Sequence, residues 1–208
     1  MIRICKNADK PQTLDKSYNT DEVCKQLLMD QNDKCYLCER HLTTDYQVEH
    51  FKSQANNGDL KQTWENLFVA CGYCNNKKSN KYDDILDPIH YDIETIIRHS
   101  NDFVNQKVIF NSDHATSEVL STIQLLNLLF NGKLPYRNCR EQRFYDEFIQ
   151  KMNFFSYAVN EYMSGKKEDY YPVIKELLDI RSEYLGFKYA IIHSNDCLLY
   201  TSPSPRDI

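Results

Sequence analysis

The chain carries CYLC at residues 35–38 and CGYC at residues 71–74, two cysteine pairs with the same internal spacing. A CxxC pair lets two adjacent thiolates bind one ion, and two such pairs complete the closed tetrahedral site typical of structural zinc. We therefore expect zinc to be held by Cys35, Cys38, Cys71 and Cys74. Because a closed site has no open coordination position, this zinc should support folding, and any chemistry must come from other residues.

The gap between the two cysteine pairs is longer than in a simple zinc ribbon, which predicts folded structure inside it. It contains the β-prone segment TDYQVEHF at 44–51, a turn at Gly58 and the apolar segment NLFVA at 66–70. A helix is expected to follow, opened by Cys74 and Asn75.

The flanking sequence is predicted to be mainly helical. Thr20 can cap a helix that ends near Asn32, and apolar residues recur at helical spacing over 119–130 and 144–159. A strand or hairpin is expected around residues 108–110. These patterns predict an α+β fold with a helical lead-in at 1–32, a small zinc-bound module at 33–88 and a mainly helical region at 89–196.

Composition narrows the class of protein. The 208 residues have a net charge of -5 and 41% hydrophobic content, which fits a globular protein and argues against one that coats nucleic acid nonspecifically. No apolar run approaches the roughly 20 residues of a membrane-spanning helix, and residues 1–10 lack the features of a secretory signal. We expect a cytoplasmic protein without a membrane partner, in which the paired cysteines bind metal rather than form disulfides.

The C-terminal segment differs in character from the rest. Residues 197–207 read CLLYTSPSPRD, which resembles a translated sequencing adapter, so we expect 197–208 to be an artefact and the native sequence to be trustworthy to about Asp196. The alternative is a Ser/Pro-rich disordered terminus.

Four elements occur in order within residues 35–78: C-x2-C, V-E-H-F, W-x-N-L and C-x2-C-N-x2-K. Together they resemble the HNH nuclease family, which has a zinc-bound ββα-metal fold. The sequence departs from that pattern in having Glu49 where Asp is commoner, and in having Lys52, Ser53 and Gln54 where many members have a proline.

The resemblance implies catalytic roles for a few residues. His50 would be the general base that activates water, and its nearly neutral pKa suits that task. Glu49 and Asn75 would hold a catalytic Mg²⁺ or Mn²⁺. Asn66 would support the loop that orients His50. Because neighbours on a regular strand point to opposite faces, the strand is expected to end, twist or bulge for Glu49 and His50 to address one phosphate.

Nucleic-acid contacts are predicted at Lys78 and Lys52. Lys78 is expected near the start of the helix, where its side chain and the N-terminal amides would hold a phosphate. The alternative is that Lys77, Lys78 and Lys81 form a solvated face. Taken singly, His50 and Glu49 are more often ordinary surface or core residues, so the hypothesis rests on the joint pattern.

Beyond the module, the LNL run at 126–128, Arg137, Arg140 and the YLGFKY segment at 184–189 are similar to HNH proteins of the Septu and retron-associated kind, which act beside an ATPase in anti-phage defence. This similarity implies that a partner ATPase docks on the helical region. The main prediction is an HNH endonuclease acting on DNA or RNA. The alternatives are a zinc-stabilised nucleic-acid or protein adaptor without catalysis, and a redox protein with reactive CxxC thiols.

Overall fold

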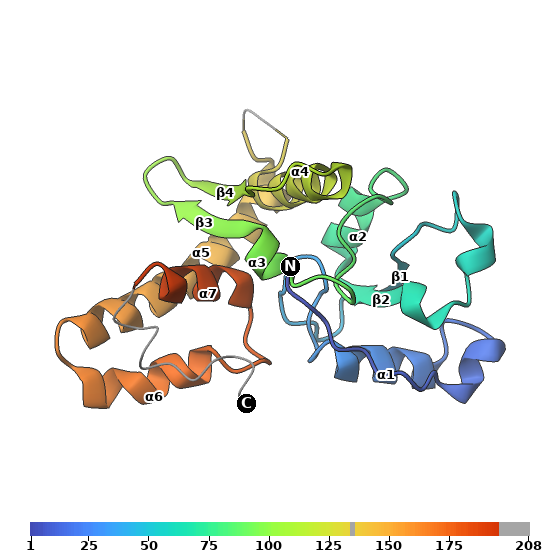
Figure 1. Ribbon diagram of the computed structural model, residues 1–208, viewed down its shortest axis with the longest axis horizontal. Helices are drawn as coiled ribbons and strands as arrows, with labels where there is room; N and C mark the ends of the chain where they lie inside the picture. The colour runs from blue at the N-terminus through green and yellow to red at the C-terminus, as the bar shows by residue number, and fades with distance from the viewer. Residues whose placement is uncertain (134–135, 196–208) are drawn as a thin grey trace.

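The computed structural model describes residues 1–133 and 136–195 (Figure 1). The predicted adapter segment at 197–208 lies outside the described residues. In chain order the elements are η1 (Gln12–Asp15), α1 (Asp21–Asp30), β1 (Gln47–His50), η2 (Gly58–Leu60), η3 (Trp64–Asn66), β2 (Leu67–Ala70), α2 (Gly72–Lys78), α3 (Ile93–Ile96), β3 (Arg98–Asp102), β4 (Lys107–Asn111), α4 (Ser117–Asn131), α5 (Cys139–Met163), α6 (Lys167–Leu177) and α7 (Leu185–His193). The fold is α+β, as the sequence predicts, with a buried four-cysteine cluster beside one small antiparallel sheet.

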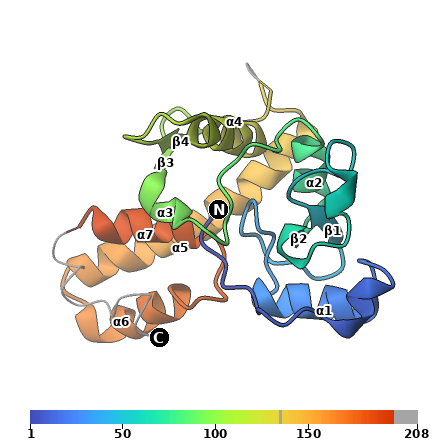
Figure 2. The same cartoon turned by 45° about the vertical axis from the view of Figure 1, so that its right-hand side comes forward.

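The first sheet pairs β1 with β2, in a register that sets Glu49 opposite Phe68 and His50 opposite Leu67. All four residues of β2 are buried because both faces of this short sheet are covered. The sheet lies between α1 on one side and α2 on the other (Figure 2). This ββα unit sets the positions of the residues that the sequence singled out.

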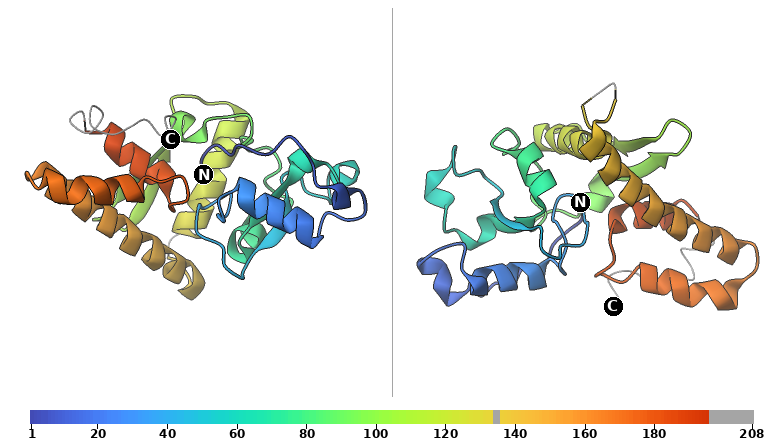
Figure 3. Two further views of the ribbon diagram at one scale, coloured as in Figure 1. Left: turned by 90° about the horizontal axis from the view of Figure 1, so that it is seen from below. Right: turned by 180° about the vertical axis from the view of Figure 1, so that it is seen from behind.

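The second half is built on the β3–β4 hairpin. Helix α4 packs against β4, and α7 packs against β3. The long helix α5 runs from beside α4 to an antiparallel hairpin with α6, as the view from behind shows (Figure 3). Among the described residues, no helix is long and apolar enough to cross a membrane.

One buried apolar core joins the two halves. It extends from Met1 and Val23 through the β1–β2 sheet to Phe148 and Phe187. Tyr73 of α2 stacks on Phe144 of α5, with ring centroids 4.6 Å apart. The ββα unit is therefore packed onto the helical half, and the division into residue ranges stays a prediction.

Local signals in the sequence account for several boundaries. Thr20 caps α1 by accepting a hydrogen bond from the Val23 amide, at 3.3 Å. Helix α4 ends at Asn131 because Gly132 follows with φ of 73°, a conformation that glycine adopts without strain. The expected start of α2 is wrong: it begins at Gly72, and Cys71 occupies the N-cap position.

Candidate active site and zinc centre

The two cysteine pairs flank the β1–β2 unit in the chain and meet in space, because the start of β1 lies beside the end of β2. Cys35 and Cys38 are in a turn closed by the Glu39 amide, which donates to the Cys35 carbonyl at 2.8 Å. Cys71 and Cys74 belong to the first turn of α2. The four sulfurs all lie within 4.8 Å of one another, and each of these four cysteines is buried.

Burial and mutual hydrogen bonding perturb the protonation of these thiols. Burial raises the pKa values of Cys38 and Cys74 well above the usual range. Hydrogen bonding from Cys35 and its neighbours lowers the pKa of Cys71. Four thiolates cannot share one dry site without a compensating positive charge, and a tetrahedral sulfur set suits Zn²⁺. The donor set therefore fits zinc, which would supply folding energy rather than an open coordination position.

His50 is the last residue of β1, and both of its ring nitrogens have partners. Nε2 lies 2.9 Å from the Lys61 carbonyl oxygen, and Nδ1 lies 3.1 Å from Nε2 of Gln54. A carbonyl only accepts, so Nε2 carries the hydrogen in the neutral ring and Nδ1 keeps its lone pair. Burial lowers the pKa of His50. The ring is thus held neutral with Nδ1 as its proton acceptor.

Glu49 points into the protein rather than toward His50's ring. The Tyr36 hydroxyl donates to Glu49 Oε2 at 2.6 Å, and Lys78 Nζ donates to Glu49 Oε1 at 2.8 Å. Only 5% of Glu49 is exposed, and burial raises its pKa although Lys78 opposes that shift. The strand pairs regularly through Glu49 and ends at His50, so the expected end of the strand is present and a bulge is absent. As neighbours on a strand, the two side chains lie on opposite faces.

Lys78 is the last residue of α2, so the expectation that it lies near the helix start is wrong. Its side chain is fully buried. Besides Glu49, its ammonium donates to the His50 carbonyl at 3.0 Å and lies 4.0 Å from Asp83 Oδ1. The idea of a solvated lysine face is also wrong for this residue. In this arrangement Lys78 joins α2 to β1 and does not reach a phosphate.

Asn66 connects the segment after β1 to the turn before β2. Its Oδ1 accepts from the Lys52 amide at 2.7 Å, and its Nδ2 donates to the carbonyls of Lys52 and Leu60 at 3.0 and 3.2 Å. Lys52 itself reaches Asp84 Oδ1 at 3.1 Å and the Asp83 carbonyl at 2.6 Å. Asn66 therefore fixes both sides of the loop that supplies Lys61 to His50.

Residues 35–81 match the model of the HNH endonuclease family. This stretch is an HNH endonuclease domain. No curated protein matches the chain. The match covers the ββα unit and both cysteine pairs, whereas α1 and the helical half lie outside it.

HNH nucleases use divalent metal ions, so we compared the expected ligands of this HNH domain, Glu49 and Asn75, with the needs of such an ion. Asn75 is partly exposed and its Nδ2 donates to Gln47 Oε1 at 2.8 Å. Both oxygens of Glu49 are engaged by Tyr36 and Lys78. Hard cations need open oxygen ligands. Glu49 and Asn75 as arranged here do not fit such an ion, because Lys78 already neutralises the carboxylate.

Sequence analysis missed several residues that contact the HNH motif. Tyr18 lies edge-on to the His50 ring, and Gln54 and Lys61 hold its two nitrogens. Tyr36 binds Glu49. No spacing rule identifies Tyr18 because it lies outside the HNH domain, but Gln54 and Lys61 flank Gly58 in the loop that the motif itself encloses.

Proposed function

We propose that the chain is an HNH endonuclease that hydrolyses phosphodiester bonds of DNA in the cytoplasm. The observation that carries this proposal is the neutral His50 with an unprotonated Nδ1, inside an HNH domain. A general base must present an unprotonated atom at working pH, and burial of this ring favours that state.

The reaction follows from that atom. A water donates one hydrogen to His50 Nδ1 and its oxygen attacks phosphorus, so the new P–O bond forms as the proton passes to the imidazole. The bond from phosphorus to the 3′ oxygen breaks, and that oxygen takes a proton from solvent. The products carry 5′-phosphate and 3′-hydroxyl ends. Asn66 holds the loop that supplies the Lys61 carbonyl, which keeps Nε2 protonated during the step.

Mg²⁺ or Mn²⁺ is the proposed cofactor, because HNH nucleases use divalent ions to stabilise charge on the phosphate. We assign no step to an ion at Glu49 while Lys78 occupies that carboxylate. Asn75, whose carboxamide is hydrogen-bonded to Gln47, is likewise assigned no step through an ion.

The test is cleavage of a supercoiled plasmid by zinc-loaded protein with Mg²⁺ or Mn²⁺. His50→Ala should lower the rate by about 10²–10⁴-fold, the usual contribution of a general base. His114→Ala is the matched control, because His114 is exposed and distant in sequence from the HNH domain. A His50→Ala protein that nicked DNA as fast as the parent would disprove the proposal.

A second candidate is a zinc-stabilised adaptor that binds nucleic acid without cutting it. The Glu49–Lys78 pair favours it, since this pair removes an expected metal ligand. A parent protein that binds the plasmid and never nicks it, with either ion, would select the adaptor.

A role as effector in ATPase-coupled anti-phage defence rests on the similarity to Septu and retron-associated HNH proteins alone. In the structure Arg137 donates to the carbonyls of Phe130 and Gln106 and covers the Tyr145 ring, so its place is structural. Arg140 remains exposed on α5. Of the two arginines, Arg140 is therefore the one left available for docking of an ATPase.

A further inference from the structure

The imidazole of His50 has three neighbours that are not motif residues themselves. Lys61 supplies a backbone acceptor to Nε2, and Gln54 supplies a donor to Nδ1. The third neighbour is Tyr18, whose ring centroid lies 4.7 Å from that of His50, with an interplanar angle of 80°. Tyr18 and Gln54 are the parts of this arrangement to which no function has been attached.

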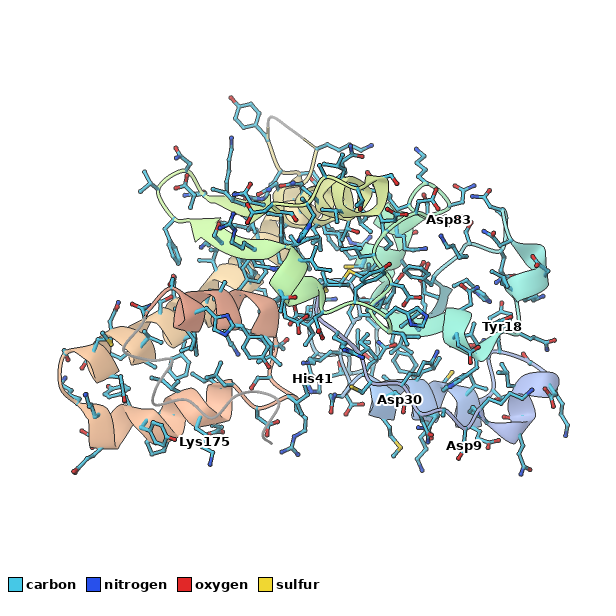
Figure 4. All side chains as sticks on the ribbon, viewed as in Figure 1. Asp9, Tyr18, Asp30, His41, Asp83 and Lys175 are labelled. Carbon is cyan, nitrogen blue, oxygen red and sulfur yellow. The ribbon has the colours of Figure 1, made fainter. Side chains whose placement is uncertain are left out.

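Tyr18 comes from the loop between η1 and α1, before the HNH domain begins. That loop is fixed at both ends, because the hydroxyls of Thr13 and Thr20 lie 2.7 Å apart and Gln62 Nε2 donates to the Leu14 carbonyl at 3.2 Å. Figure 4 shows Tyr18 at the end of α1, beneath the β1–β2 sheet. The edge-to-face contact restricts how far the His50 ring can rotate.

Gln54 is exposed, but the turn that carries it is anchored. The Ser53 amide and hydroxyl donate to the two carboxylate oxygens of Asp83 at 2.9 and 2.8 Å. The Asn57 amide donates to the Ser53 carbonyl at 2.9 Å and closes the turn. Gln54 therefore starts from a fixed backbone and its carboxamide reaches Nδ1 at 3.1 Å.

Nδ1 has one lone pair, so it accepts one hydrogen bond at a time. In the structure the Gln54 amide takes that bond, and the water attacking phosphorus must take the same place during hydrolysis. A water that donates one hydrogen to Nδ1 has a second hydrogen to place. The carboxamide of Gln54 carries an oxygen acceptor beside the Nε2 that now contacts Nδ1, and rotation of the side chain can offer that oxygen to the second hydrogen.

Building on the function proposed above, we propose that Tyr18 and Gln54 are positioning residues of the active site. Tyr18 fixes the plane of the His50 ring. Before the reaction, the Gln54 amide occupies the position on Nδ1 that the attacking water will take. When the water binds there, Gln54 accepts its second hydrogen, so that a lone pair of the water oxygen faces phosphorus. The water proton passes to Nδ1, and Gln54 is unchanged at the end of the step.

The experiment measures kcat and KM for nicking with four variants of the zinc-loaded full chain. Gln54→Met keeps length but removes the carboxamide, and Tyr18→Leu removes the ring. Each should lower kcat by about ten- to a hundredfold with KM little changed, because a misplaced reacting group costs up to about a hundredfold in rate. Tyr18→Phe keeps the ring and should retain most of the parent kcat. Gln142→Met on the exposed surface of α5 is the control and should match the parent.

The outcomes separate this inference from the proposed function. If the parent shows no His50-dependent nicking, the proposed function fails. If the parent nicks and Gln54→Met and Tyr18→Leu match it, the inference fails alone. A higher kcat in Gln54→Met would show that Gln54 merely blocks Nδ1, and a rise confined to KM would show a substrate contact, and either result overturns the positioning role. Zinc content and thermal unfolding are measured on every variant. If a variant is unfolded at the assay temperature, its loss of kcat counts against the inference, unless Tyr18→Phe retains the kcat that Tyr18→Leu loses.

Discussion

The ion pair between Glu49 and Lys78 is the buried polar contact between β1 and α2. Both side chains are enclosed, and each has a further partner, the Tyr36 hydroxyl for Glu49 and the His50 carbonyl for Lys78. Removal of two charges from water is costly, and only paired and hydrogen-bonded groups offset that cost. The pair therefore joins the end of α2 to the strand that ends in His50.

Removal of one member of this pair should be strongly destabilising. Lys78→Met leaves the Glu49 carboxylate buried without its cation, and we expect the free energy of unfolding to fall by about 3–5 kcal/mol. Urea denaturation near neutral pH measures the change. The double variant Glu49→Gln with Lys78→Met should recover much of the loss, because it leaves no unpaired charge.

Lys52→Met is the matched control for that experiment. Lys52 pairs with Asp84, whose side chain is 84% exposed, and such surface pairs contribute less than about 1 kcal/mol. Additive losses in the Glu49 and Lys78 variants would show that the two side chains are not energetically coupled.

The sequence predicted the roles of residues whose contact partners are close by in the chain. It did not predict the roles of residues whose contact partners are distant in the chain. The CxxC pairs could be found because two ligands lie within one turn. Tyr36 and Lys78 could not be assigned to Glu49, since their contacts depend on how β1, the zinc-binding turn and α2 pack together. For the same reason Tyr18 was not linked to His50.

Among the elements, α2 shows how a local rule led to an error. The sequence pattern predicted a helix opened by Cys74 and Asn75, whereas Cys71 is the N-cap and its sulfur accepts from the Cys74 amide at 3.5 Å. Cysteine is outside the usual set of N-cap residues, so the pattern gave no signal. The shift moves Lys78 from the first turn to the last, which changes its role from phosphate contact to buried ion pair.

The short elements β1, β2 and α2 should depend on zinc for their stability. Four-residue strands and a seven-residue helix have little independent stability, and structural zinc contributes folding energy outright. Chelation should therefore remove hydrogen-exchange protection from 35–78 before it affects α4 and α5. Cys71→Ser should reproduce that loss.

Cys139→Ser is the control for the zinc experiment, since Cys139 is exposed and lies outside the four-cysteine cluster. It should keep one zinc per chain by metal analysis and retain the parent exchange pattern. Unchanged protection of β1 and β2 after complete zinc removal would contradict a folding role for the metal.

At the scale of the whole molecule, a buried polar group connects the HNH domain to α7. Glu39, next to Cys38, accepts from the Gly186 amide at 3.2 Å and pairs with the N-terminal amine at 2.7 Å. Although burial opposes ionisation, that amine and Lys34 hold the pKa of Glu39 at about 2. His99 of β3 lies beside the same glycine. None of these contacts follows from sequence pattern, because they join segments far apart in the chain.

His99 should make the protein sensitive to mild acid. Its Nδ1 donates to the Ile97 carbonyl at 2.8 Å, and its Nε2 has no hydrogen-bond partner among the described residues. Burial, followed by the nearby N-terminal amine, lowers the pKa of His99 to about 3. An unfolded histidine titrates near pH 6.5, so below that value the unfolded chain binds a proton that the folded chain excludes. Stability is then fully present above about pH 6.5 and falls as the pH drops toward about 3.

The parent should therefore lose about 1.6 kcal/mol more than His99→Leu between about pH 6.5 and about pH 5, since each pKa unit corresponds to about 1.4 kcal/mol and the unfolded histidine is half protonated at the start of this range. This pH window lies above the range in which the Glu39 carboxylate of the unfolded chain takes up its proton. The pKa of His50 is also lowered, but His50 is present in both proteins, so its contribution cancels in the comparison. Urea denaturation at several pH values measures the difference, with the exposed His114→Leu as control. Parallel pH profiles for the parent and His99→Leu would show that His99 is protonated in the folded protein, and that the contact between β3 and α7 tolerates the charge.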